Sequence, residues 1–432
     1  MKKIILLYAV VLFCMPSLMA QLPEYRRSSL YSILIQHPEK EYYRELAEVF
    51  HSIPVPDKFD DHNLSIRVLD YSQITGNTSD NRTIELFSND IDTTQFISWN
   101  STALKPSETV SHVTNWLKSN GVARRMVAKW FDRNKDNGSF DMNLIAQRGL
   151  YDASAIDVAI ARRSVRGINL LADAGEELIG NTFVIINDIK YIDKEARAQR
   201  TKEIFEALGS AAAQVGGYGV QVSQLSTIGS AVSGSITGFS VSITTHLYRL
   251  DWDEETANNF YQTYYYDRQS LSPDRKAAFE RDLNMFKLTY VGSSEAKSAK
   301  TTLRGVLYPE DMIRKVCTRA IDNNIVTLQR KYDFFKVKIP LTGVEPLKAP
   351  VGVKEGVSNR SQFEVLERIE NENGRVTYRR QGIIQPVSGK IWDNTYMSTE
   401  EGYKNASLNA TEFKRVSGGP FAPGMLIREI KF

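Results

Sequence analysis

The sequence predicts an α+β protein: an α/β core with an uncharged insert rich in Gly, Ser and Ala, followed by a small C-terminal β-barrel or sandwich module. In residues 154–178 apolar side chains recur at helical spacing, Gly180-Asn181 ends that pattern, and the apolar run Phe183–Ile186 follows directly. This order predicts a helix, a tight turn and a buried strand. From residue 334 onward, short alternating segments separated by turn residues predict strands instead.

The length of the chain predicts more than one domain, because 432 residues exceed what a single core usually organises. We divide it into a signal peptide (1–20), a mostly helical region (21–150), the α/β core (151–333) with its uncharged insert (207–248), and the β module (334–432). The 42% hydrophobic and 24% charged content is typical of a folded protein. A formal net charge of +3 gives no reason to expect a nucleic-acid partner.

The first twenty residues predict export. Lys2 and Lys3 precede an apolar run over residues 4–13, and Ala20 is a plausible cleavage residue before Gln21. The run is too short for a stable membrane anchor. We therefore expect a protein exported by a signal peptide to the periplasm, or associated with the outer membrane.

The two cysteines argue against both a lipid anchor and an internal disulfide. Cys14 lies in the leader, and the residue before it is Phe13, where a lipidated cysteine normally follows a small residue. Cleavage of the leader leaves Cys317 alone, so an intramolecular disulfide is excluded. The apolar helical pattern around Cys317 predicts a buried thiol.

In the N-terminal region the pattern predicts a helix over 29–50, a strand over 64–71, and helices over 92–104 and 107–132. Asp132–Gly138 resembles part of a calcium-binding loop, which needs glycine at position 6 and a bidentate glutamate at position 12. Here glycine falls at position 7 and Asn143 at position 12. We therefore predict an exposed polar turn rather than an ion site.

The insert at 207–248 contains no Asp, Glu, Lys or Arg, and two structures compete for it. In the first, residues 222–239 form a helix of small residues and 239–247 an internal strand, with Val241 and Ile243 shielded from solvent and lipid. In the second, the alternation in 239–247 belongs to a membrane hairpin. The weak alternation upstream favours the first structure.

Further along, the sequence predicts a tyrosine-rich helical segment over 253–284 with a break at Ser272-Pro273, a strand over 285–292, a polar loop over 293–302 and a helix over 309–331. We expect the tyrosine rings to pack on a core. In the β module, strands are expected at 335–341, 382–384, 390–392 and 425–427, and a hairpin is expected around Asn373-Gly374.

No pattern in the chain points to catalysis. The five histidines stand in unrelated contexts, and the sequence has no nucleophile elbow, phosphate-binding loop or dinucleotide-binding motif. We therefore assign no catalytic, cofactor-binding or metal-binding residue and expect no cofactor. The sequence leaves enzymatic activity open but favours a non-catalytic protein.

The segments Pro350–Glu367 and Tyr378–Gly389 resemble the C-terminal module of the flagellar assembly protein T family, which are periplasmic structural proteins. The α/β core with an uncharged insert is similar in architecture to curli-secretion channel subunits, whose membrane hairpins arise from such a core. The leader ending in Ala20-Gln21 looks like that of an exported protein of Bacteroidota.

These observations predict an exported, non-catalytic cell-envelope protein that acts through contacts with other envelope proteins, with homo-oligomerisation and membrane association left open. The alternative is an oligomeric membrane-inserting or channel-like secretion component that uses residues 215–250.

Overall fold

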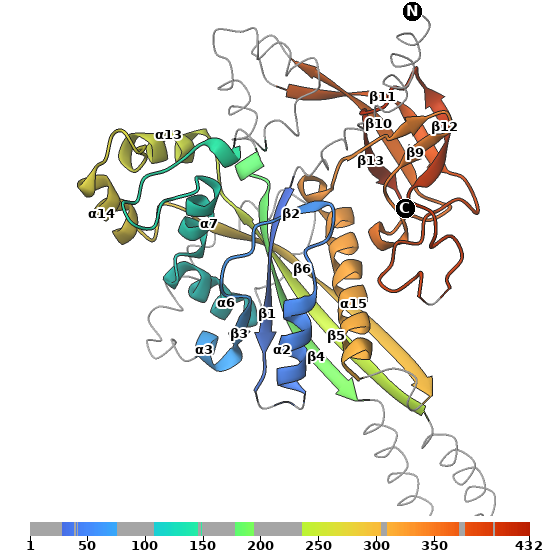
Figure 1. Ribbon diagram of the computed structural model, residues 1–432, viewed down its shortest axis with the longest axis horizontal. Coiled ribbons are helices and arrows are strands. Elements are labelled where there is room, and N and C mark those ends of the chain that lie inside the picture. The colour runs from blue at the N-terminus through green and yellow to red at the C-terminus, as the bar shows by residue number, and fades with distance from the viewer. Residues whose placement is uncertain are drawn as a thin grey trace, which may run out of the picture.

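The computed structural model describes residues 28–38, 40, 42–75, 108–145, 148, 178–193, 236–303, 309–370, 376–400 and 402–432. The protein has an α+β fold, as predicted. A six-stranded mixed sheet is covered by helices, and a curled seven-stranded antiparallel sheet follows it in the chain (Figure 1). The predicted leader and most of the 154–178 helix lie outside the described residues.

The larger sheet has the strand order β2-β1-β4-β5-β6, and β3 pairs with β1. Its strands are β1 (Ser28–Gln36), β2 (Phe59–Asp61), β3 (Val68–Asp70), β4 (Thr182–Asp193), β5 (Ile236–Leu250) and β6 (Leu288–Leu303). β1 runs parallel to β2, β3 and β4, whereas β5 is antiparallel to both of its neighbours. Strands from the region predicted as mostly helical therefore belong to the same sheet as β4, β5 and β6.

One face of this sheet packs against α2 (Tyr43–Ser52) and α15 (Pro309–Lys331). Phe183 in β4 and Leu247 in β5 are fully buried there beside Leu328 of α15. The predicted buried strand after Gly180 is confirmed, and so is the helix over 309–331. Cys317 is only 1% exposed, as expected for a core thiol.

The other face packs against α6 (Glu108–Ser119) and α7 (Val122–Trp130), and α13 (Glu254–Thr263) and α14 (Pro273–Arg281) extend the same cluster. The indole Nε1 of Trp130, which is fully buried, donates to Thr182 Oγ1 at 2.8 Å and ties α7 to the start of β4. Tyr264 and Tyr266 are buried in this cluster, so the prediction that tyrosine rings pack on the core is confirmed.

Residues 236–250 form an internal strand, which confirms that part of the favoured structure for the uncharged insert. Val241 and Ile243 are 1% and 0% exposed and lie in the cluster formed with α15. Ile236 and Phe239, which the sequence placed in a helix, belong to β5 instead. Residues 207–235 lie outside the described residues. In the part of the chain that the structure describes, no helix has the length and apolar character needed to cross a bilayer.

The predicted helix over 29–50 is wrong in its first part, which is the strand β1; the helix begins only at Tyr43. Every residue from Ser28 to Ile35 is buried, as in a parallel strand covered on both faces. The apolar residues of this segment also fit helical spacing, so their periodicity alone could not distinguish a helix from a strand.

Three other predicted elements have different bounds. The strand over 64–71 shrinks to β3, and Tyr71 begins the short helix α3 (Tyr71–Thr75). The helix over 107–132 is divided at Gly121, whose φ of 56° does not fit a right-handed helix. The polar loop over 293–302 is wrong, because these residues continue β6 to Leu303. As β6 is an edge strand, polar side chains are compatible with it.

The C-terminal sheet has the order β7-β13-β10-β11-β12-β9-β8. These strands are β7 (Ile339–Pro340), β8 (Gly343–Val344), β9 (Leu347–Ala349), β10 (Gln362–Glu370), β11 (Val376–Pro386), β12 (Thr411–Gly418) and β13 (Leu426–Lys431). Phe363, Phe413 and Ile427 are among its buried residues.

The predicted hairpin is confirmed as the antiparallel pair β10 and β11, although Asn373-Gly374 itself lies outside the described residues. The strand expected over 335–341 is mostly wrong, because Asp333–Phe335 form a 3₁₀ turn and β7 begins at Ile339. The strand expected over 390–392 is a loop with one isolated bridge, between Trp392 and Gly352. An alternation of apolar and polar residues is not specific to strands, since an extended loop on a core can have the same sequence pattern.

Candidate functional site

A cleft of about 260 Å³ lies where residues of the larger sheet and its loops meet the C-terminal module. We call it the basic cleft, because cationic side chains dominate its lining. The lining residues are Ser28, Lys58, Asn181, Asp333, Phe334, Lys336, Val337, Lys338 and Arg428.

One wall of the basic cleft is the edge of the larger sheet at which its parallel strands begin. Ser28 is the first residue of β1, and Asn181 immediately precedes β4. The two strands run parallel, so their amino ends meet at one edge. The Arg249 guanidinium fixes the turn before β4, since its Nε donates to Gly180 O at 2.7 Å.

The opposite wall is the chain that leaves α15 and enters the C-terminal sheet. Phe335 is fully buried and holds this segment against the core, whereas the neighbouring Phe334 is 40% exposed. The guanidinium of Arg249 lies 5.1 Å from the centre of the Phe334 ring. The cleft therefore has an apolar aromatic surface beside its cations.

Four cations line the cleft, and their surroundings differ. Lys336 Nζ lies 2.7 Å from Asp333 Oδ1, and this hydrogen bond lowers the pKa of Asp333. Lys338 Nζ lies 4.6 Å from the centre of the Tyr378 ring. Among the described residues, no carboxylate pairs with Lys58.

The fourth cation, Arg428, belongs to a charge cluster around a buried carboxylate in the C-terminal sheet. Its Nε donates to Glu364 Oε1 at 2.7 Å, and Arg380 Nε donates to Glu364 Oε2 at 2.7 Å. Glu364 is only 2% exposed. One carboxylate thus serves two guanidinium groups, so the cluster keeps a net positive charge next to the cleft.

This arrangement is suited to binding an anion. The lining offers ammonium and guanidinium donors, which form charge-assisted hydrogen bonds with carboxylates. Among the described residues that line the cleft, there is no histidine or cysteine to act as a base or nucleophile near neutral pH.

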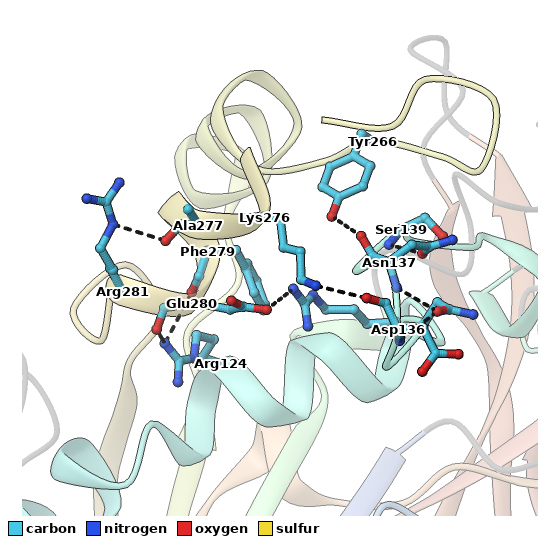
Figure 2. Close-up of polar contacts among 12 residues, drawn as sticks. Arg124, Asp136, Asn137, Ser139, Tyr266, Lys276, Ala277, Phe279, Glu280 and Arg281 are labelled. Carbon is cyan, nitrogen blue, oxygen red and sulfur yellow. Dashed lines mark hydrogen bonds and ion pairs between the residues drawn. The ribbon is translucent and has the colours of Figure 1, made fainter. Parts of the chain in front are cut away.

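The segment that resembles a calcium loop forms the predicted polar turn. Asn134 Oδ1 accepts hydrogen bonds from the backbone N–H groups of Asp136 and Asn137. Figure 2 shows the ammonium of Lys276 directed at the backbone oxygen of Asp136, at 2.8 Å, and Tyr266 donating to Asn137 O. The turn therefore joins the end of α7 to α14. Within the described residues, no three His, Cys, Asp or Glu side chains gather closely enough to hold a metal ion.

The histidines occupy unrelated positions, but one contact was missed by sequence reasoning. His37 Nε2 lies 2.8 Å from Asp188 Oδ1 at the carboxyl end of β1, which is the opposite end of that strand from the basic cleft. His62 stacks on Trp130, and burial lowers the pKa of His62 to about 3. Burial also lowers the pKa of His246. His62 and His246 are therefore neutral core groups.

Sequence reasoning also missed the basic cleft. Lys336 and Lys338 alternate with Phe335 and Val337, and this was the only local signal. Lys58 and Arg428 join them through the tertiary fold. No protein-family model matches the chain, and a search of curated proteins found no significant relative.

Proposed function

We propose that this chain is an exported, non-catalytic protein of the bacterial cell envelope, which acts by binding other envelope proteins. In this proposal the basic cleft holds an acidic segment of a partner protein. Export and location rest on the leader residues 1–20 and their resemblance to Bacteroidota leaders.

The main support for the proposal is that four cations from three separate parts of the chain meet at one cleft. Lys58 comes from the loop before β2, Lys336 and Lys338 from the segment after α15, and Arg428 from β13. Because Phe334 is exposed beside them, the best ligand pairs a carboxylate with an apolar neighbour. A peptide segment of Asp or Glu next to Leu or Phe has that chemistry.

The channel-like alternative would place residues 215–250 in a membrane hairpin. The burial of Val241 and Ile243 under α15 counts against that role for the part of the segment within β5. A lipid-facing strand would instead present those side chains to the bilayer.

The proposal is tested by titrating the purified protein with two short fluorescent peptides, one alternating Glu with Leu and the other alternating Lys with Leu. We expect saturable binding of the Glu peptide only, with an affinity that falls as salt is added. Lys58→Glu and Lys338→Glu should each weaken this binding at least about tenfold, which corresponds to roughly 1.4 kcal/mol.

Lys404→Glu is the matched control, because it makes the same charge change at an exposed position of the C-terminal module outside the cleft. It should leave the affinity unchanged, and circular dichroism should show that all three variants fold. Equal binding of both peptides, or an equal effect of Lys58→Glu and Lys404→Glu, would contradict the proposal.

A further inference from the structure

The strand β6 is a long edge of the larger sheet. It spans 16 residues and pairs with β5 along its length, and no strand among the described residues pairs with its other side. An edge of this kind presents backbone N–H and C=O groups that can extend the sheet into another chain. In Figure 1 the end of β6 reaches beyond the lower end of α15.

The side chains of β6 divide into two rows. Ser293, Glu295 and Lys297 lie on one face and are exposed. Ser294, Ala296 and Ser298 lie on the other face and are half-buried, and Ala296 packs against the cluster that includes α15. Glu295 and Lys297 are the charged members of the exposed row, with side chains 54% and 77% exposed.

Their order makes the strand complementary to itself in one antiparallel register. If two copies pair about Ala296, Glu295 of each copy lies directly opposite Lys297 of the other. A register centred on Glu295 or on Lys297 instead places like charges opposite each other. Directly opposite charges of unlike sign stabilise a strand pair, and like charges destabilise it. Charge therefore selects the register centred on Ala296.

The helix α15 fits this arrangement. It packs over both β5 and β6, on the face of Ala296. In an antiparallel pair centred on one residue, the two-fold axis is perpendicular to the sheet, so both copies of α15 would lie on the same face of the continued sheet. The two helices can thus lie side by side on one face.

We propose that two copies of this chain associate through β6, antiparallel and centred on Ala296, so that their larger sheets form one continuous sheet. Glu295 keeps its contacts within the chain, to Ser242 Oγ at 2.5 Å and to Lys297 Nζ at 3.6 Å, and gains the partner's Lys297. This inference does not rest on the basic cleft, which lies at the amino ends of β1 and β4 and not along the open side of β6.

A charge swap tests the register. Sedimentation equilibrium of the purified protein should show a dimer, and Glu295→Lys or Lys297→Glu should each weaken it at least about tenfold, because each creates two like-charged pairs. The double variant, which carries both changes, should restore dimerisation close to that of the wild type. Glu255→Lys, an exposed site on α13, is the control and should have no effect.

A cysteine variant tests the same register independently of charge. Ala296→Cys places the two thiols opposite each other, and mild oxidation should link the copies. Ser294→Cys should not do so, since it lies opposite Ser298, and Cys317 is too buried to compete. A wild type that stays monomeric at all concentrations would overturn the proposal. So would a double variant weaker than either single variant, or equal cross-linking at 294 and 296.

Discussion

At the scale of single residues, the most informative group is Asp322. It lies on α15, and its carboxyl is enclosed between this helix and the C-terminal module, whose turn Val353–Glu355 packs against α15. Burial raises the pKa of Asp322 to about 7, although the nearby ammonium of Lys354 acts in the opposite direction. The carboxyl is therefore protonated more readily in the folded chain than in the unfolded chain.

This shift predicts a pH dependence of stability. The folded state binds the Asp322 proton more tightly, so the stabilisation is fully present below the pKa of the unfolded chain, near 3.8, and is lost as pH rises through about 7. Relative to Asp322→Asn, the free energy of unfolding of the wild type should fall between these values, by up to about 1.4 kcal/mol per pH unit.

The measurement is chemical denaturation of both proteins across this pH range. Burial keeps His62 neutral in the folded chain, so the free energy of unfolding decreases as pH falls and the unfolded chain binds the proton. Both proteins contain His62, so this effect cancels in the difference between them. A difference between the two proteins that does not vary with pH would show that Asp322 is not protonated preferentially in the folded state.

At the scale of elements, the pairing of β11 with β12 depends on Gly418. Its φ is 75°, and a Cβ there would overlap the carbonyl oxygen of Gln381 on the neighbouring strand. Gly389 has a similar φ of 76°, but a Cβ there would meet nothing within 4 Å. The two glycines therefore separate the effect of backbone conformation from the effect of a clash.

We expect Gly389→Ala to lower the free energy of unfolding by about 1 kcal/mol, the effect of a left-handed backbone alone. Gly418→Ala should lower it by at least about 2 kcal/mol more, since a strand backbone has to move. Urea denaturation of the two variants measures the difference. Equal losses would mean that the strands separate locally at little cost.

The helices and strands also differ in how well the sequence predicts them. α15 has regular helical spacing, Pro309 in its first turn and basic residues in its last turn, so both its type and its bounds were predictable. β1 was not, because a strand buried on both faces has no period of two. β6 looked like a loop because its residues 293–302 are polar, a composition set by its position at the edge of the sheet.

At the scale of the whole molecule, the sequence predicted an α+β fold and a β-rich C-terminal region but not the basic cleft. The cleft depends on the packing of α15 and the segment after it between two sheets, which brings Lys58 and Arg428 together from distant parts of the chain. No local sequence pattern indicates that charged residues so far apart in the chain will line the same cleft. By contrast, the strand at Val241 and Ile243 was predictable, because apolar and hydroxyl residues alternate over residues 239–244, and the weak alternation upstream favoured burial of its apolar face inside the protein.

If the basic cleft is the binding surface of this protein, a bound peptide should slow the hydrogen exchange of the backbone amides around it. Exchange is followed by mass spectrometry with the Glu–Leu peptide, with the Lys–Leu peptide and without any peptide. We expect that only the Glu–Leu peptide slows exchange, and that it does so in residues 333–338 and 426–431, on the two sides of the cleft. Slowed exchange confined to other segments such as α13 and α14, or the same pattern with both peptides, would contradict it.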